Sequence, residues 1–424
     1  MITRIVLLLT HTAASLFTVA TLLFPLAGIP GAAQPVSVKR LDGSSITPVQ
    51  IDATVARLMA AAEVTGVGIT LFNHGEIVYQ KAYGWRDKEK SLSLTVDSVS
   101  TAASFTKSAF AYMVMQLVEE KILDLDRPVF KYLPKLLTEY PRYRDLAGDL
   151  RYERITARML LDHTSGFPNL RWLNDDHKLN INFEPGARYA YSGEGLELLQ
   201  LIVETITKKQ LEELMQERVF RPLGMTRSSM TWQSRFENDF ANGYDEYGRS
   251  LGPERRPEAN AAGSMQTTLA DFSRFIKAVM QARGLSKRTR NLMLTPQIQI
   301  VSKHEFPTLA TETTGANLPI RLSYGLGWGL YQTPYGRAFF KEGHTDGFRN
   351  YTVCFNKSGI GVVIMTNSSN GEGIYKELLE TLLRNTFTPI EWEGFTPYDQ
   401  LPPRPPLKQH KEVALDASIL EKYA

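Results

Sequence analysis

The hydrophobic residues that follow position 50 have first a helical and then a strand-like spacing. Apolar residues recur every three or four positions between 51 and 64, which predicts a helix. The runs 67–72 and 77–83 are short and rich in β-branched and aromatic residues, and the turn-forming tetrapeptide 73–76 separates them. This part of the chain is therefore predicted to be a helix followed by an antiparallel hairpin.

The same pattern returns in reverse order much later in the chain. Runs 351–355 and 361–366 read as strands around the turn 356–359, and a helix is expected from about 373 to 387. Two hairpins, each beside a helix, predict one antiparallel sheet that is built from both ends of the domain and covered by both helices.

The middle of the chain is mostly helical in pattern. Helices are expected near 104–123, 195–206, 211–220 and 269–282, and they would form a second, mostly helical lobe. The expected fold class is therefore α+β, arranged as an α/β sandwich with a helical lobe.

The two ends of the chain have a composition of their own. Arg4, an apolar run over 5–25 and the small residues before Gln34 predict a signal peptide over 1–33, or an uncleaved membrane anchor as the alternative. Either reading places the rest of the chain outside the cytoplasm, in the periplasm or the extracellular space. The main domain is expected at 45–390, followed by a Pro-rich linker and tail at 391–424.

Charge and cysteine content exclude several classes. Basic and acidic residues number 48 and 45, and no long basic run is present, so nucleic acid is not an expected partner. The single cysteine, Cys354, allows no intrachain disulfide. The seven histidines are scattered without an H-E-x-x-H motif, so neither a metal nor another cofactor is expected.

A serine and a lysine stand one turn apart where a helix is expected to begin. Ser104 and Lys107 form an S-x-x-K motif at the start of the pattern 104–123. A helix N-terminus favours developing negative charge, and a desolvated neutral amine could accept the hydroxyl proton. The motif is short, and a serine that only caps the helix, followed by a solvated lysine, would produce the same S-x-x-K pattern.

Two later elements add candidate groups. Tyr191 follows a Pro-Gly turn and precedes a helix, where its hydroxyl could reach into a site. His344 and Thr345 lie in the segment 343–347, whose glycines would let a backbone N–H approach a ligand closely. Taken alone, each of these two elements would more often have a structural role than a catalytic one.

Taken in order, these three elements resemble the motifs of the penicillin-binding protein and serine β-lactamase superfamily. The similarity is to the class C β-lactamases and their relatives, the family VIII esterases and D-stereospecific peptidases. Those proteins carry S-x-x-K, then Tyr-x-Asn, then Lys-Thr-Gly or a histidine variant. Supporting stretches extend the resemblance over most of 51–387: 155–166, 222–225, 263–265, 324–328 and 364–367.

The resemblance implies a β-lactamase/transpeptidase-like fold and an acyl-enzyme mechanism. Ser104 would attack a carbonyl carbon, with Lys107 and Tyr191 both open as the general base. His344 would take the place of the family's lysine. Backbone N–H groups of Ser104 and Gly347 would form the oxyanion hole.

The resemblance also places Thr345 and Gly193 among the residues that bind substrate, and two departures from the motifs bear on activity. Gly193 stands where the second motif has asparagine, and Asp346 stands where the third has glycine. Both argue against an efficient β-lactamase and favour an ester or peptide-like amide as the substrate. The alternative is a penicillin-binding or sensor-like protein that acylates without turnover. A Ser-His-Asp triad through Asp162 and His163 is not favoured, and the oligomeric state stays open.

Overall fold

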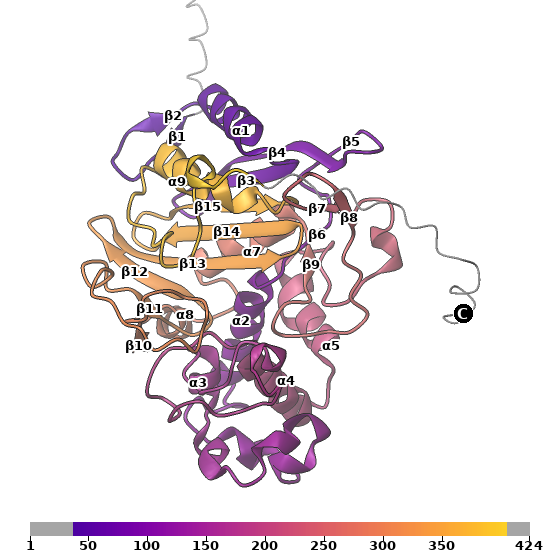
Figure 1. The fold of residues 1–424 in the computed structure, drawn as a ribbon, viewed down its shortest axis with the longest axis vertical. Coiled ribbons are helices and arrows are strands. Elements are labelled where there is room, and N and C mark those ends of the chain that lie inside the picture. Colours follow the sequence, from indigo (N-terminus) through magenta and orange to yellow (C-terminus); the bar gives the residue numbers. More distant parts are fainter. Residues whose placement is uncertain (1–36, 405–424) are drawn as a thin grey trace, which may run out of the picture. The chain divides into compact units, whose positions relative to one another are not determined.

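The computed structural model describes residues 37–404 (Figure 1). The predicted signal segment 1–33 and the tail after residue 404 lie outside the described residues. Within 37–404, no helix is both long and apolar enough to cross a membrane.

The fold is organised around one antiparallel sheet with the strand order β10-β11-β12-β13-β14-β15-β3-β4-β5. The pairing of β15 with β3 joins the two predicted hairpins, since Gly361 lies opposite Phe72 and Thr366 opposite Val67. The prediction of one sheet built from both ends of the domain is thus confirmed. The strands are β3 (Gly66–Asn73), β4 (Glu76–Asp87), β5 (Leu92–Ser93), β10 (Ile298–Gln299), β11 (Ser323–Tyr324), β12 (Gly329–Thr333), β13 (Gly336–Thr345), β14 (Phe348–Phe355) and β15 (Ile360–Thr366).

Helices cover both faces of this sheet, as Figure 1 shows. Helices α1 (Pro48–Ala62) and α9 (Tyr375–Leu383) contact each other on one face, and one hydrophobic cluster fills the space beneath them. Helices α7 (Leu269–Gln281) and α2 (Phe105–Glu119) pack against the other face, next to a second cluster. The expected α/β sandwich is therefore confirmed.

Helix α1 illustrates how local sequence sets an element. The side chain of Thr47 accepts a hydrogen bond from the backbone of Gln50, whose side chain in turn accepts one from the Thr47 N–H. Buried residues at helical spacing then face the sheet, and the helix ends at Glu63, which adopts the left-handed conformation. Pro48 fits at the first turn because its missing N–H has no helical partner there.

The helical lobe lies on the far side of α2 from the sheet (Figure 1). Twelve of the fifteen residues of α2 are buried, because this helix packs between the sheet and the lobe. The remaining helices are α3 (Ala157–Leu161), α4 (Gly193–Thr207), α5 (Leu211–Met215), a π-helical turn (Gln216–Phe220), α6 (Arg221–Leu223) and α8 (Lys287–Met293). Short 3₁₀ segments lie at Val129–Tyr132, Leu137–Glu139, Pro141–Leu146, Leu150–Arg154, Arg171–Leu173, Ser234–Phe236, Gly371–Ile374 and Tyr398–Gln400. The short strands pair as β1 (Val38–Lys39) with β2 (Ser45–Ile46), β6 (Ser100–Thr101) with β9 (Gln266–Thr267), and β7 (Gly243–Tyr244) with β8 (Ser250–Gly252).

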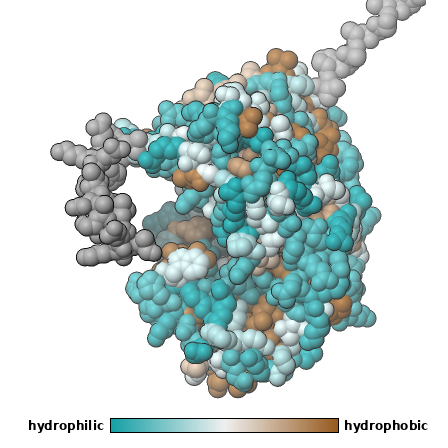
Figure 2. All heavy atoms as spheres, turned by 90° about the vertical axis from the view of Figure 1, so that its right-hand side faces the viewer, coloured by the Kyte–Doolittle hydropathy of each residue, from teal (hydrophilic) through white to brown (hydrophobic). Residues whose placement is uncertain are grey.

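The packed region continues past residue 390, where a linker was expected to begin. Trp392 and Phe395 are buried, and Phe395 packs against the rings of His344 and Tyr351. The indole N–H of Trp392 donates to the hydroxyl of Ser302 over 3.2 Å. The face turned to the viewer in Figure 2 is mostly hydrophilic, with apolar residues in small groups.

Candidate active site

Ser104 lies where a short strand turns into the buried helix α2. Strand β6 ends at Thr101, and Ala103 has a φ of +47°, which a residue with a Cβ rarely adopts. Ser104 then occupies the N-cap of α2 without using its side chain as a cap. Its backbone N–H donates no hydrogen bond to any of the described residues. The local fold therefore leaves both the hydroxyl and the N–H of Ser104 available, and it stores backbone strain next to them.

Lys107 approaches Ser104 from one turn further along α2. Its Nζ lies 3.0 Å from Ser104 Oγ and 2.5 Å from the carbonyl oxygen of Ala262. The lysine is only 3% exposed. Burial, and after it the positive charge of Lys341, lowers the pKa of Lys107 to about 7. Near neutral pH a large fraction of this amine is therefore unprotonated and can accept a proton from the serine hydroxyl.

Tyr191 reaches the same point from the helical lobe. It lies two residues before α4, and its hydroxyl is within hydrogen-bonding reach of Ser104. The Nζ of Lys107 lies 4.9 Å from the centre of its ring. Burial, and then the carboxyl of Glu342, raises the pKa of Tyr191 well above its ordinary value. The phenol is therefore held in its neutral form, which can donate a proton.

His163 holds Tyr191 in place. Its ring lies 4.5 Å from the Tyr191 ring, its Nδ1 accepts the backbone N–H of Ser192, and its carbonyl accepts the N–H of Ala190. Burial lowers the pKa of His163 well below its ordinary value, so the ring stays neutral. The neighbouring carboxylate of Asp162 accepts a hydrogen bond from a threonine hydroxyl, and no contact of the triad type links it to His163.

The third predicted element lies on β13 and is only partly brought to the site. Strand β12 pairs with β13 as far as Phe340, so residues 341–345 have no strand partner on that side. Gly343 faces α2, because a Cβ at this position would lie 2.6 Å from the carbonyl oxygen of Ala102. His344 does not join the cluster: its ring packs 4.8 Å from that of Phe395 and its Nε2 is buried without a hydrogen bond.

Residues 345–347 differ from one another in burial and in hydrogen bonding. Thr345 is half-buried at the end of β13, and its carbonyl accepts a hydrogen bond from Arg349. Asp346 is exposed to solvent. The N–H of Gly347 donates to the hydroxyl of Ser369 over 3.1 Å. The second expected oxyanion-hole donor is thus engaged elsewhere in this structure.

Three charged residues that the sequence analysis missed also lie here. Lys341 on β13 donates to the hydroxyl of Tyr191 over 3.0 Å and forms an ion pair with Glu342. Glu305 accepts a hydrogen bond of 3.0 Å from Tyr189. Burial, and then the charge of Glu342, raises the pKa of Glu305 to about 8. One signal could have indicated Lys341 and Glu342, namely two charged residues directly after the short apolar run 338–340.

Gly193, which stands where the second motif has asparagine, lies beside an asparagine from another segment, Asn169. Its N–H donates to the carbonyl oxygen of Asn169 over 3.0 Å and to the Asn169 Oδ1 over 3.1 Å. A Cβ at Gly193 would lie 2.8 Å from that carbonyl oxygen, so a side chain does not fit there without movement. The carboxamide of Asn169 thus lies beside the position where the second motif of the superfamily carries its own.

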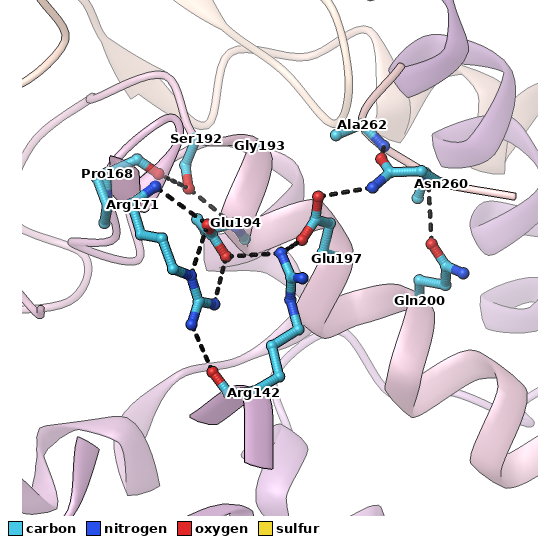
Figure 3. A network of polar contacts seen from close by, with 12 residues as sticks. Arg142, Pro168, Arg171, Ser192, Gly193, Glu194, Glu197, Gln200, Asn260 and Ala262 are labelled. Carbon is cyan, nitrogen blue, oxygen red and sulfur yellow. Dashed lines mark hydrogen bonds and ion pairs between the residues drawn. The ribbon is translucent and has the colours of Figure 1, made fainter. Parts of the chain in front are cut away.

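A polar network ties the start of α4 to the acceptor of Lys107 (Figure 3). Glu194 pairs with Arg171 and Arg142, and Arg142 also pairs with Glu197. Glu197 then accepts from Asn260, whose Oδ1 accepts the N–H of Ala262. Since the carbonyl of Ala262 binds Lys107, this network helps to fix both the residues after Tyr191 and the environment of the amine.

A serine hydroxyl beside a partly neutral buried amine, on an α/β sandwich of this kind, is the arrangement that serine hydrolases use. Among residues 37–404, no three histidine, cysteine or carboxylate side chains lie close enough to hold a metal ion. The comparison with protein families identifies the particular group. The chain belongs to the β-lactamase family, whose model matches residues 51–383.

Several known proteins are similar to this chain. Protein flp from Staphylococcus aureus (strain MRSA252) is 23% identical over 337 residues, which are 75% of this chain and 62% of that protein. Penicillin-binding protein 4* from Bacillus subtilis (strain 168) is 23% identical over 385 residues, 82% of this chain and 76% of that protein. The octameric penicillin-binding protein homologue from Pyrococcus abyssi superimposes with a TM-score of 0.65 at 25% identity, covering 80% of this chain and 78% of that one. The chain thus spans 62% of the length of Protein flp.

Proposed function

We propose that this protein hydrolyses an ester or a peptide-like amide through an acyl-enzyme on Ser104. The observation that carries the proposal is the 3.0 Å contact between Ser104 Oγ and the Nζ of Lys107, an amine whose pKa burial lowers to about 7. A lysine with an ordinary pKa would be almost fully protonated at neutral pH and could not accept the proton.

The contacts support a division of roles between the two candidate bases. Lys107 takes the proton of Ser104 as Oγ bonds to the substrate carbonyl carbon. Tyr191, whose raised pKa keeps it protonated, then donates its proton to the leaving alcohol or amine as the old bond breaks. In the second half the Tyr191 phenolate takes a proton from the water that attacks the acyl carbon, and the ammonium of Lys107 returns its proton to the serine oxygen as the acid leaves. Both residues thereby regain their starting forms.

The oxyanion formed in each half needs hydrogen-bond donors. The N–H of Ser104 is unengaged among the described residues and lies at the N-terminus of α2, where the helix dipole favours negative charge. Gly347 can serve as the second donor once its hydrogen bond to Ser369 is exchanged for one to the substrate. That requirement favours reactive esters over amides, since esters need less stabilisation of the tetrahedral intermediate.

The engaged N–H of Gly347 also supports the second candidate function, a penicillin-binding or sensor-like protein that acylates but turns over poorly. An oxyanion hole with one free donor would slow both the formation and the hydrolysis of the acyl-enzyme. The name of the relative in Bacillus subtilis, a penicillin-binding protein, is consistent with this alternative.

A pre-steady-state assay with p-nitrophenyl acetate and a labelling assay with a fluorophosphonate test the proposal. We expect a burst of p-nitrophenol followed by steady turnover, and loss of both the burst and the label in Ser104→Ala. The exposed Ser93 supplies the matched control, Ser93→Ala, which should behave as the wild type does. Stoichiometric label without turnover would support the sensor, and no reaction at Ser104 would contradict both candidates.

We further propose that the domain acts outside the cytoplasm, after cleavage following Ala33 or while held by an uncleaved N-terminal anchor. The composition of 1–33 supports this proposal. Mass spectrometry of the protein recovered from the medium or periplasm tests it, because a mature N-terminus at Gln34 is expected if cleavage occurs. Full-length protein confined to the cytoplasm would contradict it.

A further inference from the structure

Strand β13 brings a buried amine to Tyr191. Lys341 is completely buried, its Nζ lies 3.0 Å from the Tyr191 hydroxyl, and it lies 4.7 Å from the centre of the same ring. The ammonium is stabilised by an ion pair with Glu342 and by a hydrogen bond of 3.3 Å to the Glu342 carbonyl. A lysine is buried in this way only where partners offset its loss of hydration.

The alternation of side chains along β13 explains why this amine comes from residue 341. Gly343 faces α2 and the backbone next to Ser104, so Lys341, two residues earlier, shares that face. His344 is one residue out of phase and faces Phe395 on the opposite side of the sheet. The residue that corresponds by motif order to the lysine of the superfamily is therefore turned away from Tyr191.

We infer that Lys341 is a positioning residue of the active site, which holds the Tyr191 hydroxyl next to Ser104 and sets the charge beside Lys107. In this chain the amine that contacts Tyr191 therefore comes from position 341, three residues before the position that the motif order assigns to it. This inference rests on the proposed function and adds to it how the ionisation of Lys107 is controlled.

The charges around Lys107 support this role. The positive charge of Lys341 lowers the pKa of Lys107, after burial, while the carboxylate of Glu342 raises it, and the effect of Lys341 is the larger. Glu305, with a pKa of about 8, is mostly protonated at neutral pH and contributes little charge there. The groups that face Lys107 are Lys341 and Glu342 from β13, Glu305 from the segment before β11, Arg256 from the segment before β9, Tyr191 from the turn before α4 and His163 from the turn after α3.

The test is the pH dependence of labelling by a fluorophosphonate, which needs no turnover. In that reaction Oγ of Ser104 bonds to phosphorus, fluoride leaves, and the hydroxyl proton passes to neutral Lys107. The labelling rate should therefore rise with pH through the pKa of Lys107. Lys341→Met removes the positive neighbour, so the rise should move to higher pH by about one unit, and the rate at pH 7 should fall about fivefold.

Two further variants make the test directional. Glu342→Gln removes the negative neighbour, so the rise should move to lower pH, opposite to Lys341→Met. The matched control is Lys303→Met, which removes an exposed lysine paired with Glu312 and should leave the midpoint where it is. Circular dichroism and a thermal melt establish that each variant is folded.

Distinct results separate the possible failures. Equal losses at every pH in both β13 variants, with no movement of the midpoint, would overturn the inference and leave the proposed function standing. The inference is also overturned if His344→Gln moves the midpoint and Lys341→Met does not. Absence of any labelling in the wild-type protein would refute the proposed function, and the inference with it.

Discussion

The most direct test of the network in Figure 3 is the substitution Glu194→Ala. The carboxylate is 1% exposed and accepts hydrogen bonds of 2.7 and 2.9 Å from the guanidinium of Arg171, one of 3.1 Å from the Arg171 backbone, and one of 3.1 Å from Arg142. Alanine leaves the mostly buried guanidinium of Arg171 without this carboxylate and the Arg171 N–H without an acceptor.

The cost follows from this geometry. Removing one partner of a buried ion pair costs about 3–5 kcal/mol, because the remaining charge is desolvated and uncompensated. Arg142 is half-exposed and keeps Glu197, so the loss falls chiefly on Arg171, which keeps the longer contact of 3.8 Å to the carboxylate of Asp145. We therefore expect the free energy of unfolding to fall by about 3 kcal/mol. Helix α4 begins directly after Ser192, so the placement of Tyr191 and the esterase rate should suffer as well.

Urea unfolding followed by circular dichroism measures the change. The matched control is Glu184→Ala, which breaks an exposed pair with Arg154 and should cost at most about 1 kcal/mol. The reasoning is refuted if the two substitutions cost the same, or if Glu194→Ala leaves the midpoint unchanged at an unchanged slope.

Two further predictions concern substrate choice and the buried thiol. Asn169→Ala should lower kcat/KM for the p-nitrophenyl ester of N-acetyl-D-alanine by about tenfold relative to kcat/KM for p-nitrophenyl acetate, because the Nδ2 of Asn169 has no partner among the described residues and can bind the acylamino carbonyl. Asn169→Asp keeps an acceptor for the Gly193 N–H but loses the donor, so it should show the same lowered ratio. An unchanged ratio in both variants would exclude this role for Asn169. Cys354 is fully buried and burial raises its thiol pKa to about 12, so Ellman's reagent should react with it only after denaturation, and fast reaction with the native protein would contradict the packing of β14.

Much of the fold follows from local pattern. The hairpins at 67–83 and 351–366 have short apolar runs separated by turn residues, and both are present as predicted. The proximity of Ser104 and Lys107 is predicted equally well, because residues three positions apart in a helix lie on the same face. These features depend on neighbours in sequence, which is why the amino-acid sequence alone predicts them.

The rest of the site depends on contacts between distant segments. His344 was assigned by motif order, yet a shift of one position along a strand reverses the face, and only the packing of Gly343 against Ala102 fixes that face. Asn169 lies beside Gly193 because a loop approaches the first residue of α4 closely. Glu305 reaches the site through a segment that Trp392 anchors. No periodicity in the sequence encodes such contacts.

The charge balance of the buried cluster links these contacts to the chemistry. Lys341 and Glu342 form an ion pair with each other, Glu305 is mostly protonated near pH 7 because its pKa is raised to about 8, and the raised pKa of Tyr191 keeps its phenol neutral. An additional fixed positive charge on Lys107 would therefore lack a buried counter-ion, which disfavours its protonation. The same packing that buries Lys341 thus keeps Lys107 able to accept the proton of Ser104, and a change that supplies a new carboxylate near Lys107 would stabilise its charged form and slow acylation.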